Sequence, residues 1–264
     1  MGKVLAITSG KGGVGKTTMT ANIGASLAGM GQRVLLIDGD TGLRNLDMIL
    51  GNNNEVVYNY LDIIAGHCDI SSAILPYRLQ PRLYILPAPQ LHDGMVPIQP
   101  QDMVELCQKL RPMFTFILID CPAGIGRGFD NAIAGADGAL VVTNPFHTAV
   151  RDADRVIGLL EQAGFAEIML IINRIRMDMI KGGHMLAIDS IIDLLGIDTL
   201  GLVPEDDYVL ASSMYGNITA LQSEGLGREA FLNIARRLCG EVVPIIDFKQ
   251  KGFKKRWRKL LIGE

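Results

Sequence analysis

The stretch from Gly10 to Thr18 constrains the fold of this chain more than any other part of the sequence. It reads GKGGVGKTT and matches the pattern G-x-x-x-x-G-K-[ST] of a phosphate-binding loop. A short apolar run, residues 4–8, precedes it and has strand character, and residues 17–30 carry apolar side chains at helical spacing. Strand, glycine-rich loop and helix in this order predict a site where backbone N–H groups and a helix N-terminus surround phosphates.

The residue types in the loop predict which parts of a nucleotide they meet. The glycines let backbone N–H groups crowd around an anion without Cβ clashes. Lys16 is placed to reach the β- and γ-phosphates, and Thr17 is placed to bind Mg²⁺. The expected nucleotide-binding residues of the loop are Gly10, Lys11, Gly12, Gly13, Val14, Gly15, Lys16, Thr17 and Thr18.

Two later strands are expected to end in acids beside this loop. Residues 33–38 form an apolar run that ends at Asp38, with Asp40 just beyond it, and the strongest strand signal, residues 114–120, ends at Asp120. Ligands bind outside the carboxyl ends of parallel strands. A carboxylate just beyond residues 33–38 can orient a water toward the γ-phosphate, and Asp120 is placed to meet Mg²⁺ through a water. Asp38 is a further carboxylate on the metal side, and Asp40 could also cap a helix without losing its other role.

About seven predicted strands alternate with helices along the chain, which indicates the doubly wound α/β class, a mainly parallel sheet with helices on both faces. Residues 52–80 read as loops and short helices. A hydrophobic content of 48% is ample for one large core. We expect a nucleotide-binding domain over residues 1–240, a tether over 241–251 and a C-terminal amphipathic helix over 252–264.

The C-terminal stretch has the pattern of a basic amphipathic helix. Residues 249–264 carry a net charge of +6, which leaves −9 for the rest of a chain whose total is −3. At about 100° per residue, one face carries Phe253, Trp257, Leu260 and Leu261, and the basic residues around it are Lys254, Lys255, Arg256, Arg258 and Lys259. Such a helix is suited to an anionic membrane interface. A nucleic-acid-binding arm and a helix docked on a partner are the other readings, but the aromatic and leucine stripe favours a membrane.

The loop resembles the deviant Walker A loop of the MinD/ParA family of ATPases, in which a second lysine follows the first glycine, as Lys11 does here. Residues 38–47, DGDTGLRNLD, resemble the switch I of that family, and residues 120–124, DCPAG, resemble its switch II. Residues 150–155, VRDADR, and the tail segment KGFKKRW resemble the septum-placing MinD branch. The resemblance runs essentially from Lys3 to the tail.

The resemblance implies a P-loop ATPase that hydrolyses ATP slowly with Mg²⁺. Lys11 would reach across an ATP-bound homodimer to the partner's phosphates, so that the catalytic residues are Lys11, Lys16 and Asp40. In the family an asparagine at the position of Asn173 contacts the base, and the segment that matches Pro204 and Asp206 lines the other side of the adenine. Two tails on one dimer would then bind a membrane together, where one tail binds marginally.

The same resemblance implies a location and partners. The protein would be cytoplasmic and would attach to the inner face of the cell membrane when ATP-bound. There it would recruit a MinC-type division inhibitor, and a MinE-type activator would release it by triggering hydrolysis, which places the division septum. The expected partner surface comprises Arg44, Asn45, Asp152 and Asp154. The last two also suit the dipole at the start of a helix over 148–162, and that plainer role remains open.

Composition disfavours the other classes of protein. The chain starts directly in a strand with no secretory signal, and no run of 18 apolar residues predicts a membrane span. The four cysteines, Cys68, Cys107, Cys121 and Cys239, form no C-x-x-C pair, which argues against an iron–sulfur reductase or a zinc site. A ParA-type DNA-partitioning ATPase would need a basic body, and a flagellar-number ATPase of the family usually carries an N-terminal extension. We therefore expect no nucleic acid partner.

Overall fold

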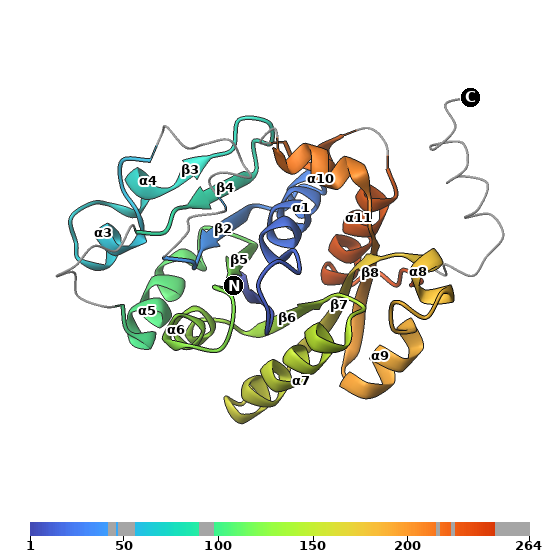
Figure 1. Cartoon of the computed structure of the whole chain (residues 1–264). Helices are drawn as coiled ribbons and strands as arrows, with labels where there is room; N and C mark the ends of the chain where they lie inside the picture. Colours follow the sequence, from blue (N-terminus) through green and yellow to red (C-terminus); the bar gives the residue numbers. More distant parts are fainter. Residues whose placement is uncertain (42–45, 47–55, 90–97, 215–216, 223–224, 246–264) are drawn as a thin grey trace.

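The computed structural model describes residues 1–41, 46, 56–89, 98–214, 217–222 and 225–245 (Figure 1). The strands are β1 (Lys3–Thr8), β2 (Val34–Asp38), β3 (Leu75–Pro76), β4 (Leu83–Leu86), β5 (Phe116–Asp120), β6 (Gly138–Thr143), β7 (Ile168–Ile175) and β8 (Asp198–Pro204). The α-helices are α1 (Lys16–Gly29), α3 (Tyr60–Ile64), α4 (Ile70–Ala73), α5 (Pro100–Leu110), α6 (Arg127–Ala134), α7 (His147–Gln162), α8 (Met177–Lys181), α9 (Ile188–Leu195), α10 (Asp207–Met214) and α11 (Leu226–Leu238), and a 3₁₀ turn, η1, spans Thr219–Leu221.

The strands form one sheet in the order β3-β4-β2-β5-β1-β6-β7-β8. Every neighbouring pair is parallel except β3 and β4. The predicted doubly wound, mainly parallel α/β fold is confirmed. The interpretation of residues 52–80 as loops and short helices was wrong at one point, because Leu75 and Pro76 pair antiparallel with β4.

The central strand β1 shows how the sheet builds a core on each of its faces. Val4 and Ala6 pack in the cluster that includes residues of α5, α6, α7 and α9. Leu5 and Ile7 point the other way and pack with residues of α1 and α11. Figure 1 shows α1 and α11 side by side, and the two helices contact each other. Because strands buried on both faces are apolar throughout, β1 reads as a continuous hydrophobic run.

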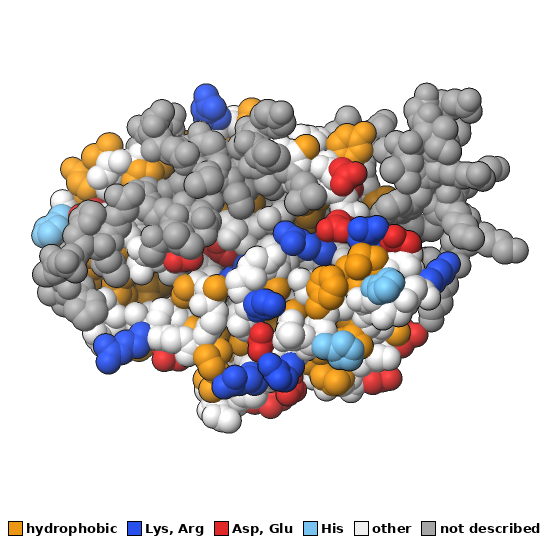
Figure 2. Space-filling model, in the orientation of Figure 1, with side chains coloured by type: hydrophobic (Ala, Val, Ile, Leu, Met, Phe, Trp, Pro, Cys, Tyr) orange, Lys and Arg blue, Asp and Glu red, His pale blue; other side chains and the backbone are white. Residues whose placement is uncertain are grey.

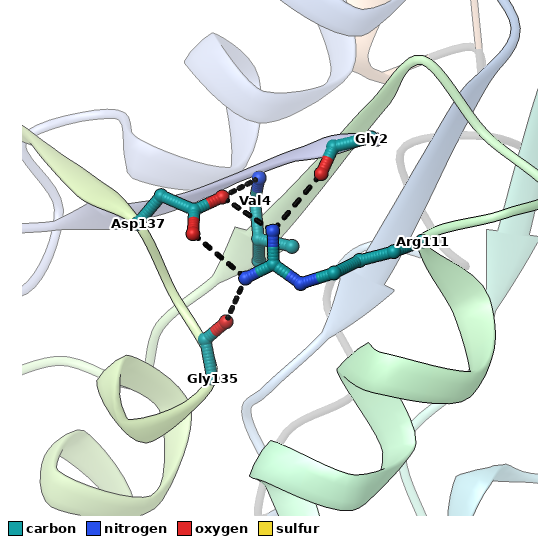
Figure 3. A network of polar contacts seen from close by, with 5 residues as sticks. All are labelled: Gly2, Val4, Arg111, Gly135 and Asp137. Carbon is teal, nitrogen blue, oxygen red and sulfur yellow. Dashed lines mark hydrogen bonds and ion pairs between the residues drawn. The ribbon is translucent and has the colours of Figure 1, made fainter.

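One arginine ties together the amino-terminal edge of the sheet (Figure 3). Arg111, just after α5, makes a bidentate pair with Asp137 at 2.7 and 2.8 Å and donates to the carbonyls of Gly2 and Gly135. Asp137 also accepts the N–H of Val4 at 2.8 Å. Burial alone would raise the pKa of Asp137, but these donors hold it below its usual value. The network fixes the start of β1, and so the direction in which that strand enters the loop.

The last described residues are fastened to the edge strand β8. Arg237 donates from Nε to the carbonyl of Val243 (2.8 Å), from Nη1 to that of Leu200 in β8 (2.8 Å) and from Nη2 to that of Pro244 (2.5 Å).

The predicted membrane-binding residues, from Phe253 to Leu261, lie outside the described residues. Within the described ranges, no helix has the length and apolar content to cross a bilayer.

Candidate nucleotide site

The site lies at the carboxyl ends of the central strands. β1 lies between β5 and β6, and the chain passes from β1 through residues 9–15 directly into α1. Asp120 at the end of β5 pairs in register with Ile7 of β1 and with Asp38 of β2. The sheet order therefore brings Asp38, Asp120 and the loop together, as the strand-end argument predicted.

The loop needs its glycines for two different physical reasons. Gly13 and Gly15 have φ of 78° and 102°, a region that L side chains rarely adopt. Gly15 is also the N-cap residue of α1. Gly10 is needed for packing, because a Cβ there would lie 2.1 Å from the carbonyl oxygen of Asp152 in α7. The loop is thus pressed against α7. No side chain caps the N-terminus of α1, which is the end of a helix that attracts an anion.

Lys16 and Asp120 form the buried polar centre of the site. Only 8% of the Lys16 surface and 1% of the Asp120 surface are exposed to solvent. Asp120 Oδ1 accepts from the hydroxyl of Thr20 at 3.2 Å, and the hydroxyl of Thr17 also bonds to this carboxyl. Burial raises the pKa of Asp120 to about 6, although Thr17, Lys16 and Thr20 oppose the rise. A carboxylate and a hydroxyl are hard oxygen donors, so Thr17 and Asp120 fit Mg²⁺.

Asp38 organises the turn after β2. It is fully buried, and its two carboxylate oxygens accept the N–H groups of Asp40 (3.0 Å) and Leu46 (3.2 Å). Through the first of these hydrogen bonds, Asp38 positions the backbone of Asp40. The half-buried Asp40 lies near enough to Asp120 to raise its pKa further. The predicted partner residues Arg44 and Asn45 lie outside the described residues.

On the far side of the loop, Asn173 at the end of β7 contacts the loop itself. Its Nδ2 donates to the carbonyl of Val14 at 2.8 Å, and the residue is 5% exposed. Asp206, just after β8, accepts the N–H of Tyr208 (2.9 Å) and that of Gly227 (3.0 Å), so it joins the starts of α10 and α11. Pro204 is buried at the end of β8. The expected contacts of these residues with a base stay predictions.

The face that carries α7 holds the remaining predicted residues. Lys11 is exposed, and its Nζ lies 3.4 Å from Thr148 Oγ1 in the first turn of α7. Asp152 is half-buried and Asp154 is exposed. A cavity of about 510 Å³ lies between α7 and α9, and Thr148, Asp154 and Leu194 are among the residues that line it. Among the described side chains in Figure 2, acidic and basic groups are interspersed over this part of the surface.

Sequence reasoning missed three described residues that shape the site. Thr20 bonds to Asp120, and it lies one helical turn after Lys16, a spacing that could have identified it. Tyr60 is 2% exposed, and burial, Asp38 and Asp40 together raise its pKa. Arg174 has a φ of 56°. The sequence carries no local signal for the last two.

Comparison with known proteins agrees with this geometry. The family model of the CobQ/CobB/MinD/ParA nucleotide binding domain matches residues 5–219. The septum site-determining protein MinD of Bacillus subtilis (strain 168) is 45% identical over 256 residues, which are 96% of this chain and 95% of that protein. Its counterpart from Synechocystis sp. (strain ATCC 27184 / PCC 6803 / Kazusa) is 43% identical over 266 residues, with full coverage of both.

Solved structures give the same result in three dimensions. The MinC:MinD cell division protein complex of Aquifex aeolicus contains a chain that is 40% identical, with a TM-score of 0.86 over 93% of this chain and 98% of that one. The septum site-determining protein MinD complexed with Mg-ADP from Pyrococcus horikoshii OT3 is 30% identical, with a TM-score of 0.81 over 90% of this chain and 96% of that one. The nucleotide in that relative is bound with magnesium, the metal that Thr17 and Asp120 fit here.

Proposed function

Because the chain belongs to the CobQ/CobB/MinD/ParA nucleotide-binding family and, within it, to the septum site-determining MinD ATPases, we propose a cycle in which ATP binding drives dimerisation and membrane attachment. The observation that carries the proposal is the buried Lys16 near Asp120 at the N-terminus of α1, which no side chain caps. A buried cation, two hydroxyls and a carboxyl at a helix N-terminus suit the phosphates of a nucleotide better than any other ligand class.

We assign the chemical roles as follows. Backbone N–H groups of residues 10–18 and Lys16 bind the phosphates, and Thr17 and Asp120 hold Mg²⁺, Asp120 through a water. When bound there, Mg²⁺ would supply positive charge opposite the phosphates. Asp40 orients the attacking water, and Asp38 holds the turn that carries Asp40. Asn173, Pro204 and Asp206 flank the base.

Dimerisation depends on Lys11. Its side chain is exposed and makes one long contact with Thr148, so it can leave that contact at little cost. In the closed dimer each Lys11 reaches the phosphates of the other subunit. A site that is complete only in the dimer would keep the turnover of the free chain slow.

The partners follow from the relatives and from α7. The Aquifex aeolicus relative assembles with MinC, and we propose a MinC-type inhibitor as a partner of this chain. We place its docking surface, and that of a MinE-type activator, on Asp152, Asp154, Arg44 and Asn45. The cavity between α7 and α9, which Asp154 lines, gives such a partner a concave surface to fill.

The division of the chain into parts completes the proposal. Residues 1–240 form the ATPase domain, 241–251 a tether, and 252–264 a basic amphipathic helix that binds the inner face of the cell membrane. Two tails on one dimer bind through effective concentration, so ATP controls attachment. The molecule is thereby cytoplasmic with ADP and peripheral on the membrane with ATP.

Co-sedimentation with vesicles that contain anionic lipid, in ATP and in ADP with Mg²⁺, tests this cycle. We expect the full chain to sediment with ATP only, and a chain truncated before Gly252 to stay in solution. Lys16→Gln should abolish sedimentation, whereas Lys109→Gln, at an exposed site in α5, should not. Binding that persists in Lys16→Gln would overturn the phosphate assignment. Binding to DNA in place of lipid would make the chain a partitioning-type ATPase.

A further inference from the structure

The end of β7 leaves the regular ladder beside the phosphate loop. Ile172 pairs with Leu202 of β8, but the next pair is Ile175 with Pro204, so two residues of β7 oppose one of β8. The two residues are Asn173 and Arg174. Arg174 has a φ of 56°, and it is the only non-glycine residue with positive φ within the described part of the chain. A β-bulge with a left-handed residue is the geometry that these values define.

The bulge changes which face of the sheet each side chain meets. Leu170 and Ile172 pack in the core under α7, and so does Ile175. A regular strand alternates, so Ile175 would otherwise point away from Ile172. The extra residue restores the apolar face at Ile175 and leaves Asn173 on the side of Ile171, which packs with α1. The bulge therefore aims Asn173 at the loop before α1.

The side-chain amide of Asn173 contacts the phosphate loop at Val14 and Gly15. Its Nδ2 donates to the Val14 carbonyl at 2.8 Å, and a Cβ on Gly15 would lie 2.4 Å from the same nitrogen. Both Val14 and Asn173 are almost fully buried, so this carbonyl has little access to water. A loop that presents its N–H groups to an anion must turn its carbonyl groups away from that anion. A carbonyl that is buried on the other side of the loop needs a hydrogen-bond donor.

We propose that Asn173 is a positioning residue for the phosphate loop, in addition to the base contact proposed above. Its amide nitrogen keeps the Val14 carbonyl turned outward, so that the N–H groups of the loop face the phosphates, and its amide oxygen is the group that faces a base. The left-handed Arg174 sets this amide in place. The inference rests on the proposed nucleotide binding. It predicts that Asn173 also strengthens the binding of a phosphate chain that carries no base.

Calorimetric binding of Mg-ATP and of magnesium tripolyphosphate, which lacks base and sugar, separates the two roles. Asn173→Leu removes the amide without adding charge, and we expect it to weaken both ligands about tenfold, the effect of one buried hydrogen bond. Asn131→Leu is the matched control. Asn131 also donates an amide N–H to a backbone carbonyl at 2.8 Å, that of Ile98, but it lies in α6. It should leave both affinities unchanged.

Other binding results would contradict the proposal in different ways. Weaker ATP binding with unchanged tripolyphosphate binding would overturn the positioning role and leave only the base contact. Unchanged binding of both ligands would overturn it as well. Wild-type protein that binds neither ligand would instead overturn the proposed function, and this inference with it.

Two substitutions of Arg174 test the bulge without touching the amide. Arg174→Gly keeps the left-handed conformation accessible, and Arg174→Val opposes it because β-branched residues adopt it at high cost. We expect Arg174→Gly to bind tripolyphosphate like the wild type and Arg174→Val to bind about tenfold more weakly. Equal losses in both variants would show that the side chain acts, and would overturn the conformational role.

Discussion

Asp120 is a buried carboxyl whose ionisation a cation bound beside it would change. The carboxyl is buried at the end of β5, and the groups around it are Thr17, Lys16 and Thr20. Burial dominates, so the pKa rises from 3.8 to about 6. In the free protein the neutral form is favoured below that pH, and Mg²⁺ would favour the charged form.

The stability of the nucleotide-free protein should record this shift. A carboxyl whose folded pKa is raised contributes stability that is fully present below its unfolded pKa and lost as the pH rises through the folded pKa. Relative to Asp120→Asn, which stays neutral, we expect the wild type to lose about 2 kcal/mol of unfolding free energy between pH 4 and pH 6.5. Denaturant unfolding of both proteins across this range, without Mg²⁺, measures the difference. A difference that stays constant with pH would contradict the shift.

Single residues of the site were predictable where the chemistry is local. Lys16, Thr17 and Asp120 follow from a loop pattern and a strand end, and the fold brings them together. The loop contact of Asn173 was not predictable, because it depends on a bulge that no residue in the sequence announces. Tyr60 was missed for the same reason, since its place beside Asp38 and Asp40 depends on how α3 packs under the sheet.

At the scale of elements, the loop that is proposed to bind the nucleotide contacts α7, the helix that is proposed to bind the partners. Gly10 lies against the backbone of Asp152, without room for a side chain. Lys11 lies beside Thr148 in the same helix. A partner that shifts α7 would therefore displace both the backbone of the loop and its second lysine.

Two glycine substitutions in the loop should differ in stability for this reason. A Cβ at Gly10 would lie 2.1 Å from the Asp152 carbonyl oxygen, whereas a Cβ at Gly12 would have the Ala123 side chain as its nearest neighbour, at 3.7 Å. We expect Gly10→Ala to cost about 1–3 kcal/mol, as overpacking does, and Gly12→Ala to cost much less. Chemical denaturation of the nucleotide-free variants measures both. Equal losses would show that α7 yields to the loop.

The elements themselves were largely predictable. Alternating strands and helices, with apolar runs bounded by glycine and acids, indicated the doubly wound sheet because parallel strands are buried on both faces. The short strand β3 was missed, since two residues carry no periodicity and pair only because β4 lies beside them.

At the scale of the whole molecule, the candidate site lies at the carboxyl ends of the central strands. Lys11 lies at the rim of that site, exposed and weakly held. In the proposed assignment the base contacts, the phosphate loop and the acids all come from one chain, so one chain would suffice to bind the nucleotide. In the proposed dimer, the partner would add a second lysine on the far side of the phosphates.

ATP should therefore change the mass of the particle in solution. We expect the wild type to double its mass with Mg-ATP, and Lys11→Ala to stay a monomer while it still binds ATP, because its own Lys16 and loop are intact. Lys181→Ala, at an exposed position in α8, is the control and should dimerise like the wild type. Light scattering during size-exclusion chromatography measures the mass. A Lys11→Ala variant that dimerises normally would refute the crossing lysine.

The fork of Arg237 on Leu200, Val243 and Pro244 has a mechanical consequence. A molecule held to a surface by its C-terminus is under tension whenever flow or a partner pulls on its body. Because Arg237 lies in α11 and bonds to Leu200 of β8, a pull on Val243 and Pro244 would reach α11 and the edge strand of the sheet at the same point. The hydrogen bonds of this one guanidinium would pass part of that force to both elements together.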